Sequence, residues 1–526
     1  MPTESDANEA AARGRALVCV PVCVRTAREL PEALSRAAQV ADVIEVRFDC
    51  LEGSEPEAAL RALAEGEAAR PLLYTFRPAP EGGRRELDIR RRLDFWSAAA
   101  GLARGPRQPA LADFELDLFV PENLARVRAL AGRCTLICSH HIFDAAPTNL
   151  EWVYQALART PAEVLKLAVT AESITDCIAV LRLLERARAD GRALVAVAMG
   201  EAGLLTRVLG PSRGSFLTYG ALDAGQATAP GQVTARELRE VYRVGSITKE
   251  TFVTGLVGSP VMHSLSPHTH NAAFAARGLD GVYIPFEVSD LDAFMRRMAL
   301  PRTRELDWNL RGLSVTAPHK REVVKYLTRL SPEAAAVGAV NTVLIEGDEL
   351  TGANTDAAAC LRPVRELLEL GGARAAVIGA GGAARALLWS LGESGARTTL
   401  FARDAARGRA LAAEFGADFA PLAGARFDGF DLVANATPLG ARGAREGETP
   451  AEAAALRGAR LAYDLVYNPA ETRFLAEARA AGCETVGGLS MLVAQAAEQF
   501  KLWTGADAPP GVMRAAAEKQ LSDAGC

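Results

Sequence analysis

The stretch Val377-Ile378-Gly379-Ala380-Gly381-Gly382-Ala383-Ala384 decides the fold of the second half of the chain. An apolar strand-like run passes directly into a G-x-G-x-x-A turn, and an alanine- and leucine-rich stretch follows. This order predicts the first βα turn of a dinucleotide-binding sheet, with the pyrophosphate at the start of the helix. The motif begins at residue 377 of 526, so enough sequence for a complete protein precedes it.

Composition is that of a globular protein with several buried cores, at 49% hydrophobic and 23% charged residues. The net charge of −5 comes from interspersed acids and bases, which argues against a nucleic-acid partner. No apolar run reaches the roughly 18 residues that a membrane span needs. The acidic N-terminus lacks the apolar core of a signal peptide, and we expect a disordered tail over residues 1–16.

Nine cysteines are scattered along the chain. The pairs Cys19/Cys23 and Cys134/Cys138 lie in apolar, strand-like runs, and neither has the spacing of a metal site. We expect buried reduced thiols, no bound metal and a cytoplasmic setting.

The first half alternates between strand-like and helical segments. Eight alternations in about 230 residues predict a (β/α)₈ barrel, with an open doubly wound sheet as the alternative. The strand-like runs are 17–24, 43–49, 71–77, 110–116, 135–141, 164–170, 193–200 and 215–222.

Polar side chains gather at the carboxyl ends of these runs, where barrel enzymes place their catalytic groups. They are Glu45, Arg47, Asp49, Arg77, Glu115 and His141. Lys166 differs, because it lies inside the apolar run Val164–Val169. A buried lysine is costly unless it is deprotonated or paired. A neutral amine would suit a Schiff base, whereas a buried ion pair, for example with Glu45, is the structural alternative.

Several of these segments together resemble type I 3-dehydroquinate dehydratase over residues 17–244. They are Val43–Asp49, Tyr74–Gly83, Ser139–Phe143, Val164–Val169 and Ala227–Gln232. The resemblance implies that Lys166 forms an iminium with the substrate ketone, that His141 moves the proton, and that Glu81 orients His141. It also implies substrate contacts from Glu45, Arg47, Arg77, Arg207, Thr228 and Gln232.

Two residues depart from this family. Thr228 stands where the family more often has serine, which keeps the hydroxyl. His140 beside His141 is unusual, and the second histidine is taken as catalytic because it aligns with the family's Ser-x-His.

A second group of motifs follows a junction at Gly245–Glu250. Ser264 and Ser266 are two residues apart, so both hydroxyls can point at one carboxylate. Pro318 suits the first turn of a helix, which would place Lys320 near a helix start and facing a cleft; a solvated surface lysine is the alternative.

These segments, with Ala339–Thr342, Gly352–Asp356, Asn435–Gly440, Asp464–Pro469 and Gly488–Gln495, resemble shikimate dehydrogenase over residues 250–506. The resemblance implies that Lys320 and Asp356 form the catalytic pair while NADPH delivers hydride. The implied substrate contacts are Ser264, Ser266, Thr316, Asn341, Tyr467 and Gln495. Ser314 replaces the usual asparagine and Ala359 the common glycine, either of which could shift substrate preference.

The cofactor preference is predicted from the turn after the strand-like run Arg397–Ala402. Arg403 and Arg407 there suit a 2′-phosphate, so we expect NADP, although Asp404 keeps NAD possible. The predicted cofactor contacts are Gly379, Gly381, Gly382, Ala383, Ala384, Arg403, Arg407, Thr437, Leu465 and Gly488.

The two resemblances together predict a bifunctional enzyme of the shikimate pathway. We expect a barrel over 17–246, a substrate-binding domain over 247–357 completed by 488–510, and a Rossmann-type NADP domain over 358–487. The expected partners are small-molecule substrates only. A catabolic quinate/shikimate enzyme and a non-catalytic regulatory homologue remain as alternatives.

Overall fold

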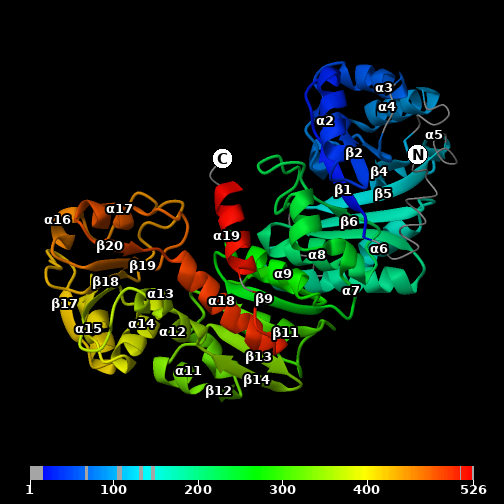
Figure 1. The fold of residues 1–526 in the computed structure, drawn as a ribbon. Helices are drawn as coiled ribbons and strands as arrows, with labels where there is room; N and C mark the ends of the chain where they lie inside the picture. The colour runs from blue at the N-terminus through cyan, green and yellow to red at the C-terminus, as the bar shows by residue number, and fades with distance from the viewer. Residues whose placement is uncertain are drawn as a thin grey trace. The chain divides into compact units, whose positions relative to one another are not determined.

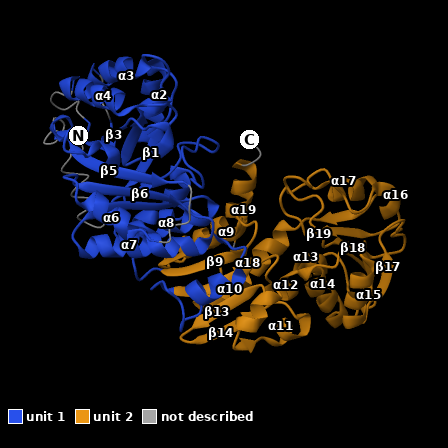
Figure 2. Cartoon of the chain, turned by 180° about the vertical axis from the view of Figure 1, so that it is seen from behind, with its two compact units in different colours: residues 1–251, 286–309 blue, residues 252–285, 310–526 orange. Residues whose placement is uncertain are grey.

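The computed structural model describes residues 16–65, 69–102, 109–128, 134–143, 149–509 and 511–523. The expected tail lies outside these residues except for Ala16. The chain forms two compact units, residues 1–251 with 286–309 and residues 252–285 with 310–526 (Figure 2). Among the described residues, no helix is long and apolar enough to cross a membrane.

The first unit contains an eight-stranded barrel (Figure 1). The strand order is β7-β6-β5-β4-β3-β2-β1-β8, and every pairing is parallel. A parallel bridge from Ser215 to Leu194 of β7 closes the ring just before β8. The barrel prediction is therefore confirmed over the open sheet. The strands are β1 Val18–Val22, β2 Val43–Arg47, β3 Leu72–Thr75, β4 Leu111–Glu115, β5 Thr135–Ile142, β6 Val164–Thr170, β7 Ala193–Met199 and β8 Thr218–Tyr219.

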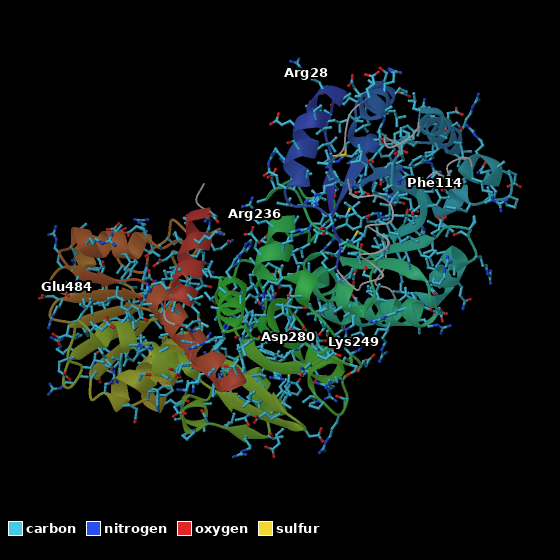
Figure 3. The ribbon with its side chains drawn as sticks, turned by 45° about the vertical axis from the view of Figure 1, so that its right-hand side comes forward. Arg28, Phe114, Arg236, Lys249, Asp280 and Glu484 are labelled. Atoms are coloured by element: carbon cyan, nitrogen blue, oxygen red, sulfur yellow. A yellow bond between two sulfur atoms is a disulfide. The ribbon has the colours of Figure 1, made fainter. Side chains whose placement is uncertain are left out.

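Helices follow the strands and cover the barrel. They are α2 Leu30–Ala38, α3 Glu55–Glu65, α4 Ile89–Leu102, α5 Leu124–Arg128, α6 Glu151–Ala158, α7 Cys177–Ala189 and α8 Leu204–Leu209, with a last helical turn at Glu237–Val241. Phe114 of β4, labelled in Figure 3, is fully buried and stacks on Trp96 of α4 at 4.2 Å between ring centroids. Aromatic contacts of this kind fix the outer face of the barrel to its helices.

Cys23 corrects the expectation of buried reduced thiols. It is exposed and forms a disulfide with Cys50. The two residues come just after β1 and β2, and adjacent parallel strands bring their carboxyl ends to the same edge. Cys19, Cys134 and Cys138 are buried and free, as expected.

The second half of the chain contains two further six-stranded sheets. The first, mixed in direction, has the order β10-β9-β11-β13-β14-β12. Its strands are β9 Phe252–Gly258, β10 Gly281–Glu287, β11 Leu310–Val315, β12 Arg329–Leu330, β13 Thr342–Glu346 and β14 Glu349–Ala353, and its helices include α9 Ser266–Ala276, α11 Pro332–Val337 and α12 Thr355–Ala359.

The second sheet is parallel throughout, in the order β17-β16-β15-β18-β19-β20. Numbered from β15, this is the 3-2-1-4-5-6 order of the Rossmann fold. The Rossmann prediction is therefore confirmed. The elements are β15 Arg374–Ile378, β16 Arg397–Ala402, β17 Asp418–Pro421, β18 Leu432–Asn435, β19 Leu461–Asp464, β20 Glu484–Val486, α14 Gly382–Glu393, α15 Ala405–Glu414, α16 Ala453–Leu456 and α17 Arg473–Ala480.

The chain then returns to the mixed sheet through α18 Leu489–Thr504, followed by α19 Val512–Asp523. Trp503 of α18 packs in one apolar cluster with Phe252, Phe274 and Tyr283, and its Nε1 donates to the carbonyl of Val343. The C-terminal helices are thus part of the core beside the mixed sheet.

Candidate active sites

A cavity of about 180 Å³ opens at the carboxyl ends of the barrel strands. Glu45 and Lys166 reach it from inside β2 and β6, and Arg47, Arg77 and His141 from the strand ends. Loops after the strands supply the remaining polar groups, which are Glu81, Thr228 and Gln232, and α8 supplies Arg207.

Lys166 is buried and held from two sides. Its Nζ donates to Asp113 Oδ2 at 2.8 Å and to Tyr219 Oη at 2.9 Å, and Glu45 Oε1 lies 3.8 Å away. The ion-pair alternative is therefore realised, with Asp113 as the near partner and Glu45 as the more distant one. This pairing is compatible with imine chemistry, because Lys166 also lines the cavity.

The arginines of the cavity differ in their partners. Arg47 forms two 2.8 Å hydrogen bonds to Asp49. Arg77 donates to Asp113 at 2.5 Å and to Glu115 at 3.3 Å. Both guanidinium charges are compensated by the protein itself.

Arg207 has no such partner among the described residues. It is 1% exposed and donates only to the carbonyls of Tyr219 and Pro230, at 3.4 and 3.2 Å. Burial lowers the pKa of its guanidinium to about 10. An uncompensated cation at a buried cavity favours an anionic ligand.

His141 is held by Glu81, whose Oε2 accepts from the His141 backbone N–H at 2.7 Å and lies 3.0 Å from Nδ1. Burial, reinforced by Arg77, lowers the pKa of His141 to about 3. The ring is therefore neutral at physiological pH, as a general base must be.

A second cavity, of about 460 Å³, lies between the mixed sheet and the Rossmann sheet within the second unit. Lys320 and Asp356 both line it, and Lys320 Nζ donates to Asp356 Oδ2 at 2.6 Å. Lys320 is therefore a paired side chain at a cavity, which excludes the alternative of a solvated surface lysine.

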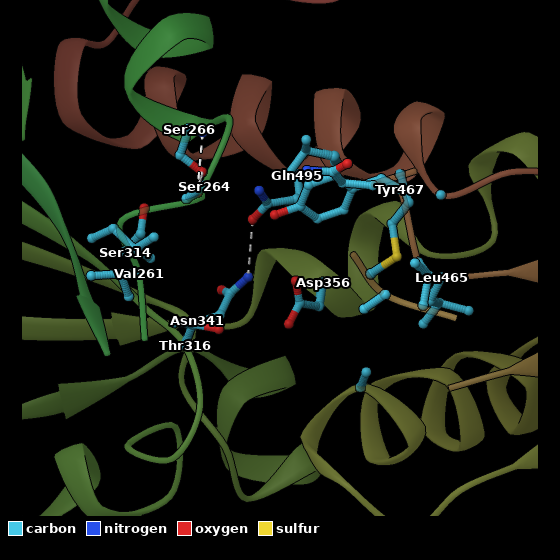
Figure 4. Close-up of a pocket in the computed structure, with 18 of the residues that line it drawn as sticks. Val261, Ser264, Ser266, Ser314, Thr316, Asn341, Asp356, Leu465, Tyr467 and Gln495 are labelled. Carbon is cyan, nitrogen blue, oxygen red and sulfur yellow. Dashed lines mark hydrogen bonds between the residues drawn. The ribbon is translucent and has the colours of Figure 1, made fainter. Parts of the chain in front are cut away.

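The polar groups around this pair come from several elements (Figure 4). Ser264 Oγ donates to Ser266 Oγ at 3.1 Å, and Asn341 Nδ2 donates to Gln495 Oε1 of α18 at 3.4 Å. Burial raises the pKa of Tyr467, so its hydroxyl stays protonated and can donate a hydrogen bond. Such a ring of neutral hydroxyl and amide groups suits a polyhydroxylated ligand.

The expectation of a helix start at Pro318 is wrong. The Ala317–Pro318 bond is cis, and residues 317–320 form a turn in which the His319 N–H donates to the Thr316 carbonyl. The next helical element is a 3₁₀ helix over Glu322–Tyr326. The turn, rather than a helix N-terminus, carries Lys320 to Asp356.

A third cavity, of about 640 Å³, lies over the glycine-rich turn. Gly379 has φ +117°, and a Cβ there would come within 2.9 Å of Thr437 Cγ2. A Cβ on Gly381 would meet only open space, which leaves its backbone accessible at the start of α14. These residues fit the pyrophosphate of a dinucleotide.

The surroundings of Asp404 distinguish between the two nicotinamide cofactors. Its Oδ1 accepts the N–H groups of Ala406 and Arg407, both at 3.0 Å, and so caps α15. A carboxylate used as a helix cap is poorly placed for a ribose hydroxyl. Arg403 and Arg407 line the cavity together with Arg445, and three guanidinium groups there fit a 2′-phosphate.

Family models and curated relatives match both halves of the chain. A model described as type I 3-dehydroquinase matches residues 18–249, one for the shikimate dehydrogenase substrate binding domain matches 256–343, and one for the shikimate 5′-dehydrogenase C-terminal domain matches 488–518. The chloroplastic bifunctional 3-dehydroquinate dehydratase/shikimate dehydrogenase of Arabidopsis thaliana is 32% identical over 520 residues, covering 94% of this chain and 83% of its own. This chain belongs to that bifunctional family.

Relatives of the dehydrogenase half alone are also similar. The NADP(+) shikimate dehydrogenase of Geobacter metallireducens is 43% identical over 285 residues, which cover 51% of this chain and 96% of its own. The crystal structure of shikimate 5-dehydrogenase from Thermus thermophilus in complex with NADP(H) and shikimate is 38% identical, covers 51% of this chain and 99% of its own, and has a TM-score of 0.46.

Most residues expected from the sequence line the cavity to which they were assigned. Every residue that the dehydratase resemblance implied borders the barrel cavity, and every one expected in the catalytic pair and substrate site of the dehydrogenase borders the second. Asp49 and Glu115, also expected from their places at the strand ends, do not line the barrel cavity and instead accept hydrogen bonds from Arg47 and Arg77. The expected cofactor residues are divided between two cavities. Those at the third cavity are Gly379, Gly381, Arg403, Arg407 and Thr437. Those at the second are Ala383, Leu465 and Gly488.

Two cofactor candidates line neither cavity. Gly382 lies against the Lys320 side chain, since a Cβ on Gly382 would be 3.3 Å from Lys320 Cδ. Ala384 is fully buried in the Rossmann core, where a small residue allows close packing of helix and strand.

Sequence reasoning missed several polar residues at these sites. In the dehydratase half they are Asp113 and Tyr219, which hold Lys166. In the dehydrogenase half they are His263 and Arg442, which line the substrate cavity, and Arg445, which lines the cofactor cavity. Asp113 carried a usable signal, since it lies two residues before Glu115 and so shares its face of β4.

Proposed function

We propose that the barrel cavity dehydrates 3-dehydroquinate to 3-dehydroshikimate, and that the second unit reduces this product to shikimate with NADPH. The observation that carries the dehydratase proposal is that Lys166, His141 and the uncompensated Arg207 face one buried cavity. An amine, a neutral imidazole and an unpaired cation are what β-elimination from a ketone with a carboxylate requires.

In the barrel, the Lys166 amine adds to the substrate ketone and water leaves, which gives an iminium. His141 then removes a proton from the carbon next to the iminium carbon, since the positive nitrogen can accept the electron pair. The same imidazolium protonates the departing hydroxyl as the C–O bond breaks. Water hydrolyses the iminium, which restores Lys166 and releases the unsaturated ketone. Arg207 holds the carboxylate throughout.

In the second unit, Ser264 and Ser266 hold the substrate carboxylate, and Asn341 and Gln495 hold its hydroxyls. NADPH, when bound, supplies the hydride to the carbonyl carbon. Lys320 gives a proton to the carbonyl oxygen, and Asp356, 2.6 Å from Nζ, keeps the ammonium directed at that oxygen. Arg403 and Arg407 bind the 2′-phosphate, which accounts for the choice of NADPH.

One coupled assay tests both sites. Intact enzyme given 3-dehydroquinate and NADPH should consume NADPH and form shikimate. K166A should consume none from 3-dehydroquinate but proceed normally from 3-dehydroshikimate, whereas K320A should accumulate 3-dehydroshikimate. Borohydride added with 3-dehydroquinate should increase the mass of the Lys166 peptide. Unimpaired dehydration by K166A would contradict the imine mechanism.

The same assay with quinate distinguishes the catabolic alternative. The hydroxyls of Ser264, Ser266 and Thr316 favour shikimate, so oxidation of quinate with NADP should be much slower. Faster turnover of quinate would overturn the biosynthetic assignment.

We place the enzyme in the cytoplasm, because six of its described cysteines are buried free thiols. There the glutathione pool should keep Cys23 and Cys50 reduced. Rapid alkylation of freshly lysed cells should therefore label both thiols, and an oxidised pair in the cell would contradict this location.

A further inference from the structure

Glu81 joins two neighbouring histidines at the end of β5. Its Oε1 lies 2.9 Å from His140 Nδ1, and its Oε2 lies 3.0 Å from His141 Nδ1. The carboxylate therefore spans the catalytic histidine and a histidine that lies outside the cavity lining. His140 is the more exposed of the two, with 29% of its side-chain surface accessible against 10% for His141.

These contacts fix which nitrogen of each ring carries the proton. An ionised carboxylate only accepts hydrogen bonds, so each Nδ1 bonded to Glu81 must carry hydrogen. Nε2 of His141 then keeps its lone pair, which is the form a general base needs. Arg77 competes for the same atom, since its NH1 lies 3.3 Å from His141 Nδ1 and can only donate. That contact requires the opposite tautomer, in which Nε2 carries the proton and cannot act as the base.

We propose that His140 is a positioning residue of the dehydratase, which anchors Glu81 so that His141 is held as the tautomer that can accept the substrate proton. Without His140, Oε1 of Glu81 loses this partner, and the carboxylate, then held only through Oε2 by the His141 backbone N–H, can turn about that bond away from Nδ1. Arg77 would then select the inactive tautomer. This inference rests on the proposed role of His141 as the base.

The anchor also makes the dehydratase sensitive to acid. Glu81 raises the pKa of His140, and the two histidines hold the pKa of Glu81 well below its usual range. The other charged group that acts on His140 is Asp117, which is paired with Arg92 at 2.5 Å, and the register neighbour on β6 is apolar Leu167. When His140 takes up a proton, its positive charge partly neutralises the negative charge of Glu81. Less of that negative charge is then available to stabilise the imidazolium form of His141.

Two variants separate anchoring from charge. H140L fills the space without a hydrogen-bond donor. We expect its dehydratase kcat to fall roughly tenfold, with KM little changed. This fall is smaller than the 10²–10⁴-fold that a positioned acid–base group contributes, because His140 acts only through Glu81. H140N keeps a donor for Glu81 but cannot be protonated. It should restore most of kcat at pH 8 and exceed the wild type at the acid end of the pH profile.

A double-variant cycle tests whether His140 acts through Glu81. In an E81Q background, H140L should reduce kcat by no more than about twofold, because coupled residues are not additive. The dehydrogenase site contains neither Glu81 nor His140. Its turnover, measured on the same preparation, therefore serves as the control for folding and concentration. The proposal is overturned if H140L leaves dehydratase kcat and its pH profile unchanged, if its effect appears only in KM, or if it adds fully to E81Q.

Discussion

Arg207 illustrates at the residue scale how function conflicts with stability. A buried guanidinium without a carboxylate partner costs free energy of folding, because its solvation is lost and little is gained in return. The protein retains this cost at the barrel cavity, where an anionic substrate would offset it.

R207M should therefore improve stability while it damages binding. Methionine fills a similar volume without charge, so we expect the unfolding free energy of the barrel to rise by about 1–2 kcal/mol. The KM for 3-dehydroquinate should rise roughly 10- to 100-fold, since charge-assisted hydrogen bonds contribute about 1.5–3 kcal/mol. Denaturant titration and steady-state kinetics on one preparation check both effects, and a destabilised R207M would show that Arg207 is compensated in the free enzyme.

His270 is a second residue whose charge state folding controls. It is fully buried on α9 and stacks on Tyr283 at 4.4 Å between ring centroids. Burial lowers its pKa to about 3, against about 6.5 in an unfolded chain. The folded state thus binds this proton more weakly, so its contribution is present above pH 6.5 and is lost as the pH falls below that value.

H270F keeps the stacked ring and removes the titration. Between pH 6.5 and pH 5 the wild type should lose about 1–2 kcal/mol through this one group, and H270F should lose correspondingly less. The denaturant midpoint for loss of dehydrogenase activity, taken at both pH values, measures the difference. Equal acid sensitivity in the two proteins would mean that protonation of His270 is not what destabilises the fold in acid.

At the scale of elements, the turn between β16 and α15 divides two tasks between adjacent residues. Asp404 caps the helix, and Arg403 lines the cofactor cavity. The sequence alone left Asp404 open as an NAD ligand, because whether a carboxylate caps a helix or faces a ribose depends on backbone geometry.

R403A should raise the KM for NADP roughly 10- to 100-fold and leave that for NAD nearly unchanged, because only NADP carries the 2′-phosphate. D404A is the matched control, and it should lower stability by about 1 kcal/mol through loss of the cap without a switch to NAD. If R403A affected both cofactors equally, Arg407 or Arg445 would be the residue that binds the 2′-phosphate instead.

The same scale shows what sequence patterns can and cannot predict. The barrel strands lie within the β-type runs apart from Ile142 at the end of β5, because apolar periodicity is local. Asp113 was missed as the partner of Lys166, since β5 separates β4 from β6 and only the folded barrel brings these two side chains together. The Cys23–Cys50 pair was missed for a similar reason, as 27 residues separate the two. Most of the candidate site residues line the expected cavities, because short motifs place them there.

At the scale of the whole molecule, each half has its own apolar core. One cluster fills the barrel around Leu73, Ile137 and Leu217, and others lie under the Rossmann sheet and around Phe500 and Trp503. A chain with separate cores can in principle be divided between them.

Residues 1–246 should therefore dehydrate 3-dehydroquinate alone, and residues 247–526 should reduce 3-dehydroshikimate alone. The cut removes the exposed hydrogen bonds from Arg182 to Glu305 and the ion pair between Lys249 and Glu185 at 3.1 Å. The loss of each should cost at most about 1 kcal/mol. Separate expression and assay of the fragments, with the intact chain alongside, decides the point. If neither fragment works when the intact chain does, the boundary or the independence is wrong.

The Cys23–Cys50 bond has a practical consequence for anyone who stores this enzyme. It closes a loop between the ends of β1 and β2, and a cross-link over 27 residues typically stabilises by about 3–4 kcal/mol. Protein stored in air, with the bond formed, should therefore keep its dehydratase activity longer on heating than protein stored with dithiothreitol. The dehydrogenase activity should be lost at the same rate in both. C23S/C50S should behave in air as the wild type does with the reductant, and identical heat inactivation of all three would mean that the bond contributes nothing to the barrel.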